Sequence, residues 1–574
     1  MRLSASFGAA MASSLAVCRL HMKGRGSLSK CLQKVDTFLH RTIGTNVVAV
    51  QEEREGCKSL YGVQAERQEQ AERSVLISCH SRTNEKKFLK YLSRHGDINK
   101  YFFYESYGMY AVVEFANREG LVSLLEEAAI PSISHESMVP FKSRLLSLRN
   151  LGSADASNQQ SGQQCQPQTT IPINELIQRL SREESIEQQI TSLTHVYQLT
   201  EENSRLRFLV CSLLKDIAAA YFPECTINPF GSSVNGFGKL GCDLDMFLDL
   251  DGISGRNAKM PKSGLWLEYQ MKRANSERAV TQSLLSVIGD CVDQFGPGCV
   301  GVQKILNARC PLVRFAHQPS GFQCDLTANN RVAMKSTELL YLYGELDPRV
   351  RHLVFTVRCW ARAHGITSSI PGAWITNFSL TVMVLFFLQR RSPSIIPTLD
   401  HLRDLAGPGD KSVIEGNDCT FVSDFGKIQL PSNAETLEKL LCEFFEFYAT
   451  FAFNKMSISI RKGKEQNKPE VAPLHIQNPF ETSLNVSKNV NVTQLDRFVA
   501  LCQESSWLLQ QSDTNTPRGG NAGKAPTPWG LATLLMPSQV AGIKGRKKRR
   551  REPASERIKS LLESLKNTNQ HKKS

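Results

Sequence analysis

Residues 230–248 read FGSSVNGFGKLGCDLDMFL, and this stretch decides the interpretation of the whole chain. In its second half, Asp243 and Asp245 alternate with apolar residues, which is typical of a half-buried β-strand. Residues two apart on a strand share a face, so the two carboxylates are expected to lie side by side. Two negative charges so near each other repel unless a cation lies between them. Mg²⁺ and Mn²⁺ prefer carboxylate oxygens as ligands. The stretch therefore predicts a divalent metal site.

The first half of the stretch predicts a phosphate-binding turn. Gly231 lets backbone amides approach a phosphate closely, and Ser232 adds a hydroxyl donor at the start of a helix. A Gly-Ser turn alone says little. Followed eleven residues later by a carboxylate pair on an apolar strand, it indicates a site that binds a nucleotide and metal together.

A third acid is needed to hold two metal ions about 4 Å apart. Asp325 is the candidate, because it follows the strand-like segment 312–316 after a short turn. A hairpin there would return Asp325 to the first pair. Asp249 and Asp251 continue the alternation of the first strand, and we interpret them as solvated acids at its end.

Composition excludes several classes of protein. The chain has 574 residues, of which 41% are hydrophobic and 22% charged, so it can bury a large core and is not wholly disordered. Its 16 cysteines include no C-x-x-C pair, which argues against zinc and disulfide frameworks and favours reduced thiols. No stretch approaches the ~18 apolar residues of a membrane span, so we expect no membrane insertion.

The net charge of +14 is concentrated at the two ends of the chain. Residues 1–35 hold six Lys or Arg and no acid, so residues 1–40 are predicted to be a mitochondrial transit peptide, with the matrix as destination. Residues 511–574 are predicted to be a disordered basic tail, whose Lys/Arg run at 544–551 could instead serve nuclear import or nucleic-acid binding. Apolar spacing over 558–565 predicts a short amphipathic helix in this tail.

A small domain is predicted over residues 70–145. Strands at 75–79, 100–104, 109–115 and 132–139, with helices at 85–94 and 118–128, follow the order β-α-β-β-α-β and resemble an RNA-recognition domain. Leu76 and Val112 replace aromatics expected on its base-stacking face. RNA binding and a packing role, including assembly of a homodimer, both stay open. The polar, Gln-rich residues 146–172 are predicted to be a linker.

The acidic motifs resemble the DNA polymerase β nucleotidyltransferase superfamily, and further segments narrow the resemblance to its noncanonical poly(A) polymerases and terminal uridylyltransferases. The resemblance implies an α/β (α+β) fold, with a polymerase β-like palm over 173–335 and a helical central and PAP-associated domain over 336–510. The supporting segments are Phe322-Gln323-Cys324-Asp325, Asn329-Asn330-Arg331, Asp347-Pro348-Arg349-Val350-Arg351, residues 357–366, Asn478-Pro479-Phe480 and Leu484-Asn485-Val486.

The resemblance also implies roles for single residues around the nucleotide. Arg358 and Arg362, at i and i+4 of a helix, fall where relatives place basic residues on the triphosphate; a solvated basic face is the alternative. Phe378, with Asn377 beside it, falls where relatives stack an aromatic on the base; a core aromatic is the alternative. Thr337 is the substitute for a ribose-contacting Asn, which this chain lacks at Ser336. His475 is interpreted as a loop histidine.

These inferences together predict an enzyme that transfers AMP from ATP to RNA 3′ ends and releases pyrophosphate, acting on mitochondrial transcripts. Asp243, Asp245 and Asp325 would hold the metal ions, and no His or Ser nucleophile is assigned. A terminal uridylyltransferase is the alternative within the enzymes. A non-catalytic RNA-binding scaffold is the alternative outside them, although all three acids are present.

Overall fold

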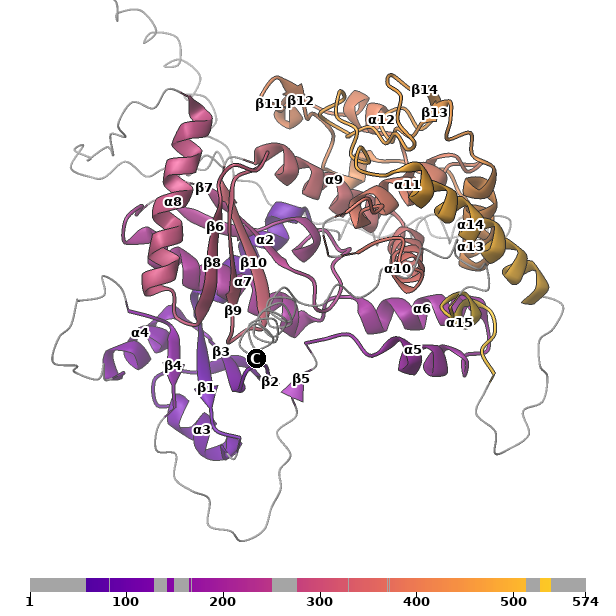
Figure 1. The fold of residues 1–574 in the computed structure, drawn as a ribbon. Coiled ribbons are helices and arrows are strands. Elements are labelled where there is room, and N and C mark those ends of the chain that lie inside the picture. Colours follow the sequence, from indigo (N-terminus) through magenta and orange to yellow (C-terminus); the bar gives the residue numbers. More distant parts are fainter. Residues whose placement is uncertain are drawn as a thin grey trace, which may run out of the picture. The chain divides into compact units, whose positions relative to one another are not determined.

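A computed structural model describes residues 58–128, 142–148, 165–166, 168–512 and 527–537, apart from residues 82, 224, 250–275, 329, 369 and 371 (Figure 1). All of these residues belong to one compact unit, Arg54–Ser574. The predicted transit peptide, the strand at 132–139, Asp251 and the amphipathic helix at 558–565 lie outside the described residues.

The small domain has the predicted order of strands and helices, preceded by an additional helix. Its sheet runs β4-β1-β3-β2-β5, in which β1 pairs with β3 antiparallel and with β4 parallel. The strand beside β1 is therefore Leu145–Ser147. Part of the predicted linker, β5, adds a short strand to the other edge. The elements are α2 Leu60–Glu72, β1 Ser74–Cys79, α3 Glu85–Leu92, β2 Ile98–Glu105, β3 Met109–Phe115, α4 Arg118–Glu127, β4 Leu145–Ser147 and β5 Cys165–Gln166.

One face of this sheet is buried against the rest of the chain. Leu76, Phe102, Tyr104 and Val112 share a hydrophobic core with helix α7 (Glu201–Ala219) and with the strands of the second sheet. The Tyr104 hydroxyl also donates a hydrogen bond of 2.8 Å to the backbone oxygen of Pro319. This is the face on which an RNA-recognition domain stacks bases. In this chain it packs, which confirms the packing interpretation for this face; homodimer formation stays a prediction.

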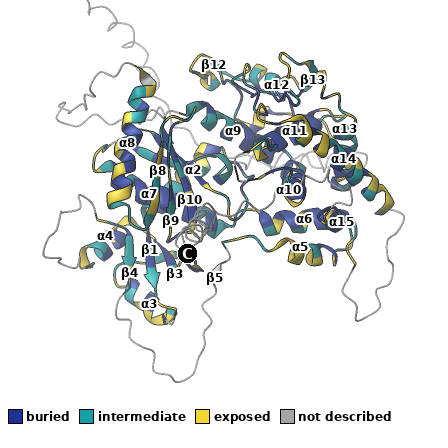
Figure 2. Ribbon diagram, in the orientation of Figure 1, coloured by how far each residue is buried: buried dark blue, intermediate teal, exposed yellow. Residues whose placement is uncertain are grey.

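The second sheet is the predicted palm. Its order is β6-β7-β10-β9-β8, and all neighbours are antiparallel except β7 and β10. Most side chains of the central strands β7 and β10 are buried (Figure 2). Hydrophobic residues of α7 and α8 share a core with the sheet. The elements are β6 Thr226–Pro229, β7 Leu244–Asp249, α8 Glu277–Phe295, β8 Cys299–Ile305, β9 Leu312–His317 and β10 Phe322–Ala328.

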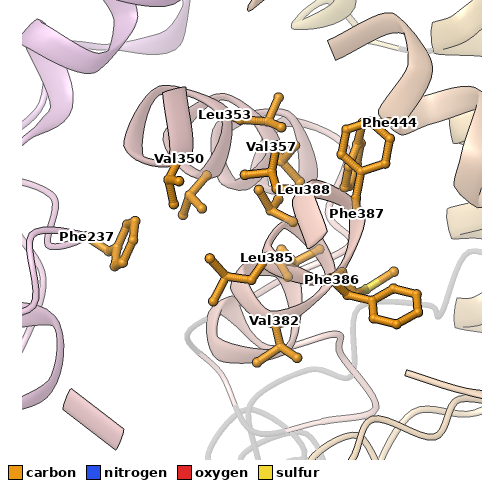
Figure 3. Packing of buried hydrophobic residues seen from close by; sticks show 14 of the residues in the cluster. Phe237, Val350, Leu353, Val357, Val382, Leu385, Phe386, Phe387, Leu388 and Phe444 are labelled. Atoms are coloured by element: carbon orange, nitrogen blue, oxygen red, sulfur yellow. The ribbon is translucent and has the colours of Figure 1, made fainter. Parts of the chain in front are cut away.

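The helical part is organised around α10 and α11. Asp347 caps the N-terminus of α10, and Pro348 occupies its first turn, where a missing N–H costs nothing. Helix α11 is buried from Ser379 to Gln389 and packs on α10 (Figure 3). Among the described helices, none combines the length and apolar character of a membrane span. The helices are α9 Arg331–Leu346, α10 Pro348–Ala363, α11 Asn377–Gln389, α12 Leu399–Asp404, α13 Leu437–Thr450 and α14 Val492–Ser512.

Two short strand pairs complete this part, β11 Val413–Ile414 with β12 Asn417–Asp418 and β13 Met456–Ser457 with β14 Gln466–Asn467. Helices α5 (Ile173–Leu180) and α6 (Ile186–Tyr197) also contribute to the helical core. So does α15 (Leu531–Leu534), whose Leu531 is fully buried. The prediction of a disordered tail from residue 511 is therefore wrong for residues 527–537, where four apolar side chains pack into the core.

Candidate active site

Strand register brings the predicted acids together. β9 and β10 form the expected hairpin, and β10 then pairs with β7 in parallel. In this pairing Asp325 lies directly opposite Asp245, and Asp243 immediately precedes β7. Asp249 ends the same strand and does not line the cavity described below.

The electrostatics of these carboxyl groups favour a cation. Burial, with the nearby carboxylates of Asp325 and Asp243, raises the pKa of Asp245 to about 7. Burial and then Asp325 also raise the pKa of Asp243. Each shift means that the ionised form is disfavoured in the protein alone, and a divalent cation would reverse that preference. The donor set of carboxylate oxygens fits Mg²⁺ or Mn²⁺.

Asp325 has a partner that sequence reasoning missed. Arg314 lies opposite it across the β9–β10 hairpin and donates two hydrogen bonds, 2.8 Å from Nε to Oδ1 and 2.6 Å from Nη2 to Oδ2. Among the described residues, no three acid, His or Cys side chains form a ready metal-binding group, and both oxygens of Asp325 are committed to Arg314. The predicted hairpin was the one sequence feature that could have revealed this partner. In an antiparallel hairpin that pairs residue 317 with residue 322, residue 314 is paired with residue 325.

The Gly-Ser turn is fastened beside Asp245. Gly231–Ser233 form a 3₁₀ turn, and the φ of Gly231 is 63°, a conformation that favours glycine. A Cβ on Gly231 would lie 3.3 Å from Oδ2 of Asp245. The Gly231 N–H donates a 3.0 Å hydrogen bond to Oγ1 of Thr337 in α9. The turn, the strand and the helix are thus joined at one point.

A cavity of about 1250 Å³ opens beside this point. It lies between residues of the palm and residues of the helical part. Asp325 is not among its lining residues, whereas the other predicted site residues all are. These are Gly231, Ser232, Asp243, Asp245, Thr337, Arg358, Arg362, Asn377 and Phe378.

The two arginines of α10 have different surroundings. Arg358 donates hydrogen bonds to the backbone oxygens of Phe237 (2.7 Å) and Asn377 (3.2 Å) and to Oγ1 of Thr381 (2.6 Å). Burial lowers its pKa to about 10. Arg358 therefore joins α10 to α11 and to the loop after the Gly-Ser turn, with its guanidinium already occupied.

Arg362 is exposed, and no described residue forms a hydrogen bond or an ion pair with it. Lys239, which sequence reasoning missed, lines the same cavity, and burial followed by the charge of Arg362 lowers its pKa. Two cations that repel each other in the lining of one cavity favour the binding of a polyanion there. The signal in the sequence was a lysine four residues before Asp243.

The remaining predicted residues vary in their freedom to contact a nucleotide. Phe378 is partly buried and packs on the helical core, and it also lines the cavity. The structure is therefore compatible with both interpretations, a core aromatic and an aromatic that stacks on the base. Thr337 is buried, and its hydroxyl donates to the backbone oxygen of Ala333 while accepting the Gly231 N–H. Ser336 lines the cavity beside it. His475 lies in a loop outside the cavity lining, hydrogen-bonded to Ser457.

Comparison with known proteins identifies the family. The chain is 59% identical to the mouse protein named "Poly(A) RNA polymerase, mitochondrial" over 512 residues, which cover 89% of this chain and 86% of the mouse protein. It is 58% identical to the human protein of the same name, over 88% and 85% of the two chains. The chain belongs to the mitochondrial poly(A) RNA polymerase family. The predicted resemblance and the predicted enzyme class, a poly(A) polymerase, are confirmed.

Solved structures of mitochondrial poly(A) polymerase, abbreviated mtPAP in their titles, support the same assignment. The apo structure matches with a TM-score of 0.77 and 55% identity over 84% of this chain and 100% of that one. A complex with ATPγS matches with a TM-score of 0.76, the same identity and the same coverage. Further structures in that group are complexes with UTP, GTP and CTP. The predicted fold class is confirmed.

Three family models match successive parts of the chain. "RL domain" covers residues 59–129, which is the small domain. "Poly(A) RNA polymerase, mitochondrial-like, central palm domain" covers residues 186–345. "Cid1 family poly A polymerase" covers residues 436–484, which include the Asn478-Pro479-Phe480 segment that supported the resemblance.

Proposed function

We propose that this poly(A) polymerase transfers AMP from ATP to RNA 3′ ends in the mitochondrial matrix, at the cavity bounded by Gly231, Asp243 and Asp245. One observation carries the proposal. Strand register places Asp325 opposite Asp245, and a Cβ added to Gly231 of the Gly-Ser turn would lie 3.3 Å from Oδ2 of the same Asp245. A phosphate-binding turn and a cluster of metal-ligand oxygens thus meet at one wall of a nucleotide-sized cavity.

In this proposal Asp243, Asp245 and Asp325 hold one divalent ion, and Asp243 with Asp245 hold a second. Mg²⁺ or Mn²⁺ bound there would supply charge neutralisation and would lower the pKa of the RNA 3′-hydroxyl. Each oxygen of Asp325 accepts one hydrogen bond from Arg314, so Asp325 would bind the ion through the lone pairs that these two bonds leave available. Asp245 must also be ionised, and its pKa of about 7 in the protein alone makes this step dependent on the cation.

The chain's cations and backbone amides position the triphosphate. The Gly231–Ser233 turn offers its amides and the Ser232 hydroxyl near Asp245. Arg362 and Lys239 face the cavity, with charges that a triphosphate would neutralise. Arg358 holds the helices behind them, and we assign it a supporting role. Positioning and charge neutralisation then account for catalysis, because phosphoryl transfer needs little covalent chemistry from the protein.

The part of the cavity that would hold the nucleotide base does not by itself identify the preferred nucleotide. Relatives have been crystallised with ATPγS, UTP, GTP and CTP, so occupancy of the cavity does not distinguish a poly(A) polymerase from a uridylyltransferase. Among the aromatic residues that line the cavity, we assign the partly buried Phe378 to stacking on the incoming base.

Primer extension tests the proposal. The full chain is given a labelled RNA, Mg²⁺ or Mn²⁺, and each nucleoside triphosphate in turn, beside Asp243→Ala/Asp245→Ala and the matched control Asp249→Ala. We expect long products with ATP from the wild type and from the control, and none from the double variant. RNA binding by the double variant, measured by fluorescence anisotropy, should persist. Preference for UTP would replace the donor and keep the mechanism. Folded wild type that binds RNA but extends with no nucleotide would establish the scaffold.

A further inference from the structure

Helix α7 carries an arginine whose side chain is completely buried although no carboxylate among the described residues hydrogen-bonds to it. Arg207 is 0% exposed. Taking a guanidinium out of water is costly unless each donor finds an acceptor. Neutral groups supply those acceptors here: Oδ1 of Asn203 at 2.8 Å, Oγ of Ser233 at 2.9 Å, the backbone oxygen of Cys242 at 2.8 Å and that of Asp243 at 2.9 Å.

The acceptors belong to separate parts of the candidate active site. Ser233 ends the Gly-Ser turn, and Asp243 is the first of the proposed metal ligands. The guanidinium also lies over the ring of Phe322, 4.6 Å from its centroid, at the start of the strand that carries Asp325. One side chain therefore contacts the Gly-Ser turn, the backbone at Cys242 and Asp243, and the start of β10.

The chain between the turn and the acids gives a reason for such a contact. Residues 234–242 contain Gly236 and Gly241 with φ of 81° and 74°, together with Gly238. Glycine-rich backbone has many accessible conformations, so this loop alone does not hold Ser233 and Asp243 at a constant separation. A side chain from outside the loop that hydrogen-bonds to both of its ends would keep that separation constant.

We propose that Arg207 is a positioning residue for nucleotidyl transfer, which holds the Gly-Ser turn, the Asp243 backbone and the start of β10 in the register that the reaction needs. This inference rests on the proposed function. The Arg207 side chain is not among the residues that line the cavity, so the proposed effect is on the geometry of the site. A planar guanidinium donates in several fixed directions at once, which a lysine ammonium on a flexible stem does not reproduce.

The alternative is an arginine that only stabilises the core, and the chain offers a matched control for it. Arg144 is 5% exposed and makes a comparable set of bonds, from Nε to Asp216, from Nη1 to the backbone oxygens of Ala71 and Ser74, and from Nη2 to Ser212. It anchors the small domain to α7, away from the cavity.

The test compares Arg207→Lys, Arg144→Lys and Ser233→Ala by thermal unfolding and by steady-state primer extension with ATP. We expect Arg207→Lys to lower kcat by about 10²-fold, the scale of a small misplacement of reacting groups, while KM for ATP changes by less than about threefold. Arg144→Lys should lower the melting temperature comparably and keep kcat within about twofold of wild type. Ser233→Ala retains the arginine and removes one of its acceptors, so it should lower kcat by about threefold or more.

The outcomes separate this proposal from the proposed function. A wild type that does not extend RNA overturns both. An active wild type with Arg207→Lys within about threefold of the kcat of Arg144→Lys overturns only the positioning role. If Arg207→Lys does not fold, Ser233→Ala decides: unchanged kcat overturns the positioning role, and a lowered kcat at unchanged melting temperature supports it.

Discussion

Replacing Asp245 by Asn should make the metal-free protein more stable while abolishing its activity. Asp245 lies beside other carboxylates in a partly buried position, and this arrangement raises its pKa from 3.8 to about 7. A carboxyl group whose pKa is higher in the folded than in the unfolded chain favours folding when protonated. That stability is lost as pH rises from the unfolded value through the folded one. Asn keeps the shape of the protonated group and never ionises.

The size of the effect follows from the two pKa values. Their difference of about 3 pH units corresponds to about 4 kcal/mol at 1.36 kcal/mol per unit, fully expressed above pH 7. At pH 5.5 the unfolded chain has already released the proton and the folded chain has not, so the cost is about 2 kcal/mol. Between pH 5.5 and 8.5 the wild type should therefore lose about 2 kcal/mol of stability that Asp245→Asn retains.

Thermal and urea unfolding in EDTA at these two pH values, for wild type, Asp245→Asn and the control Asp249→Asn, measure the difference. We expect Asp245→Asn to unfold at higher temperature than wild type, with the larger gain at pH 8.5, and Asp249→Asn to show no such pH-dependent gain. Mg²⁺ should stabilise the wild type at pH 8.5 and have little effect on Asp245→Asn. A gain that is equal at both pH values, or no gain at pH 8.5, would refute the electrostatic reasoning.

Three further expectations concern contacts away from the acids. Arg309 and Glu481 both line the cavity and form a partly exposed ion pair of 2.5 Å. Arg309→Glu or Glu481→Arg should therefore raise KM for ATP modestly, and the double exchange should restore it; no restoration would show that the pair does not act as a unit. Phe102→Ala, in the buried face of the small domain, should cost about 3–5 kcal/mol of stability, read from urea unfolding, and leave RNA affinity of the folded protein unchanged; a selective loss of affinity would contradict the packing role. Deleting residues 538–574 should reduce the salt dependence of RNA binding, measured by fluorescence anisotropy between about 50 and 200 mM salt. Residues 541–574 hold twelve Lys or Arg against three Glu, and cations that bind phosphates release counterions from the RNA. An unchanged salt slope would exclude the tail from RNA binding.

Sequence reasoning succeeded where the chemistry is local. Alternation of apolar residues with Asp243 and Asp245 predicted the strand, and the short turn before Asp325 predicted the hairpin, because side-chain periodicity and turn length follow from the backbone itself. The nature of the site, carboxylates beside a glycine turn, was thus determined by residues close together in the sequence.

Only the tertiary structure determined which polar and charged groups bind to each other. The hydrogen bonds that bury Arg207 and occupy Arg358 join residues as far as 26 and 121 positions apart, as in Arg207–Ser233 and Arg358–Phe237. The same holds for the small domain: the sequence left both RNA binding and packing open for its sheet face, and the structure covers that face with α7. Periodicity tells which face of an element is apolar or charged. What lies against that face is set by how distant segments pack, and packing also determines whether an arginine is available to a ligand or already bound within the protein.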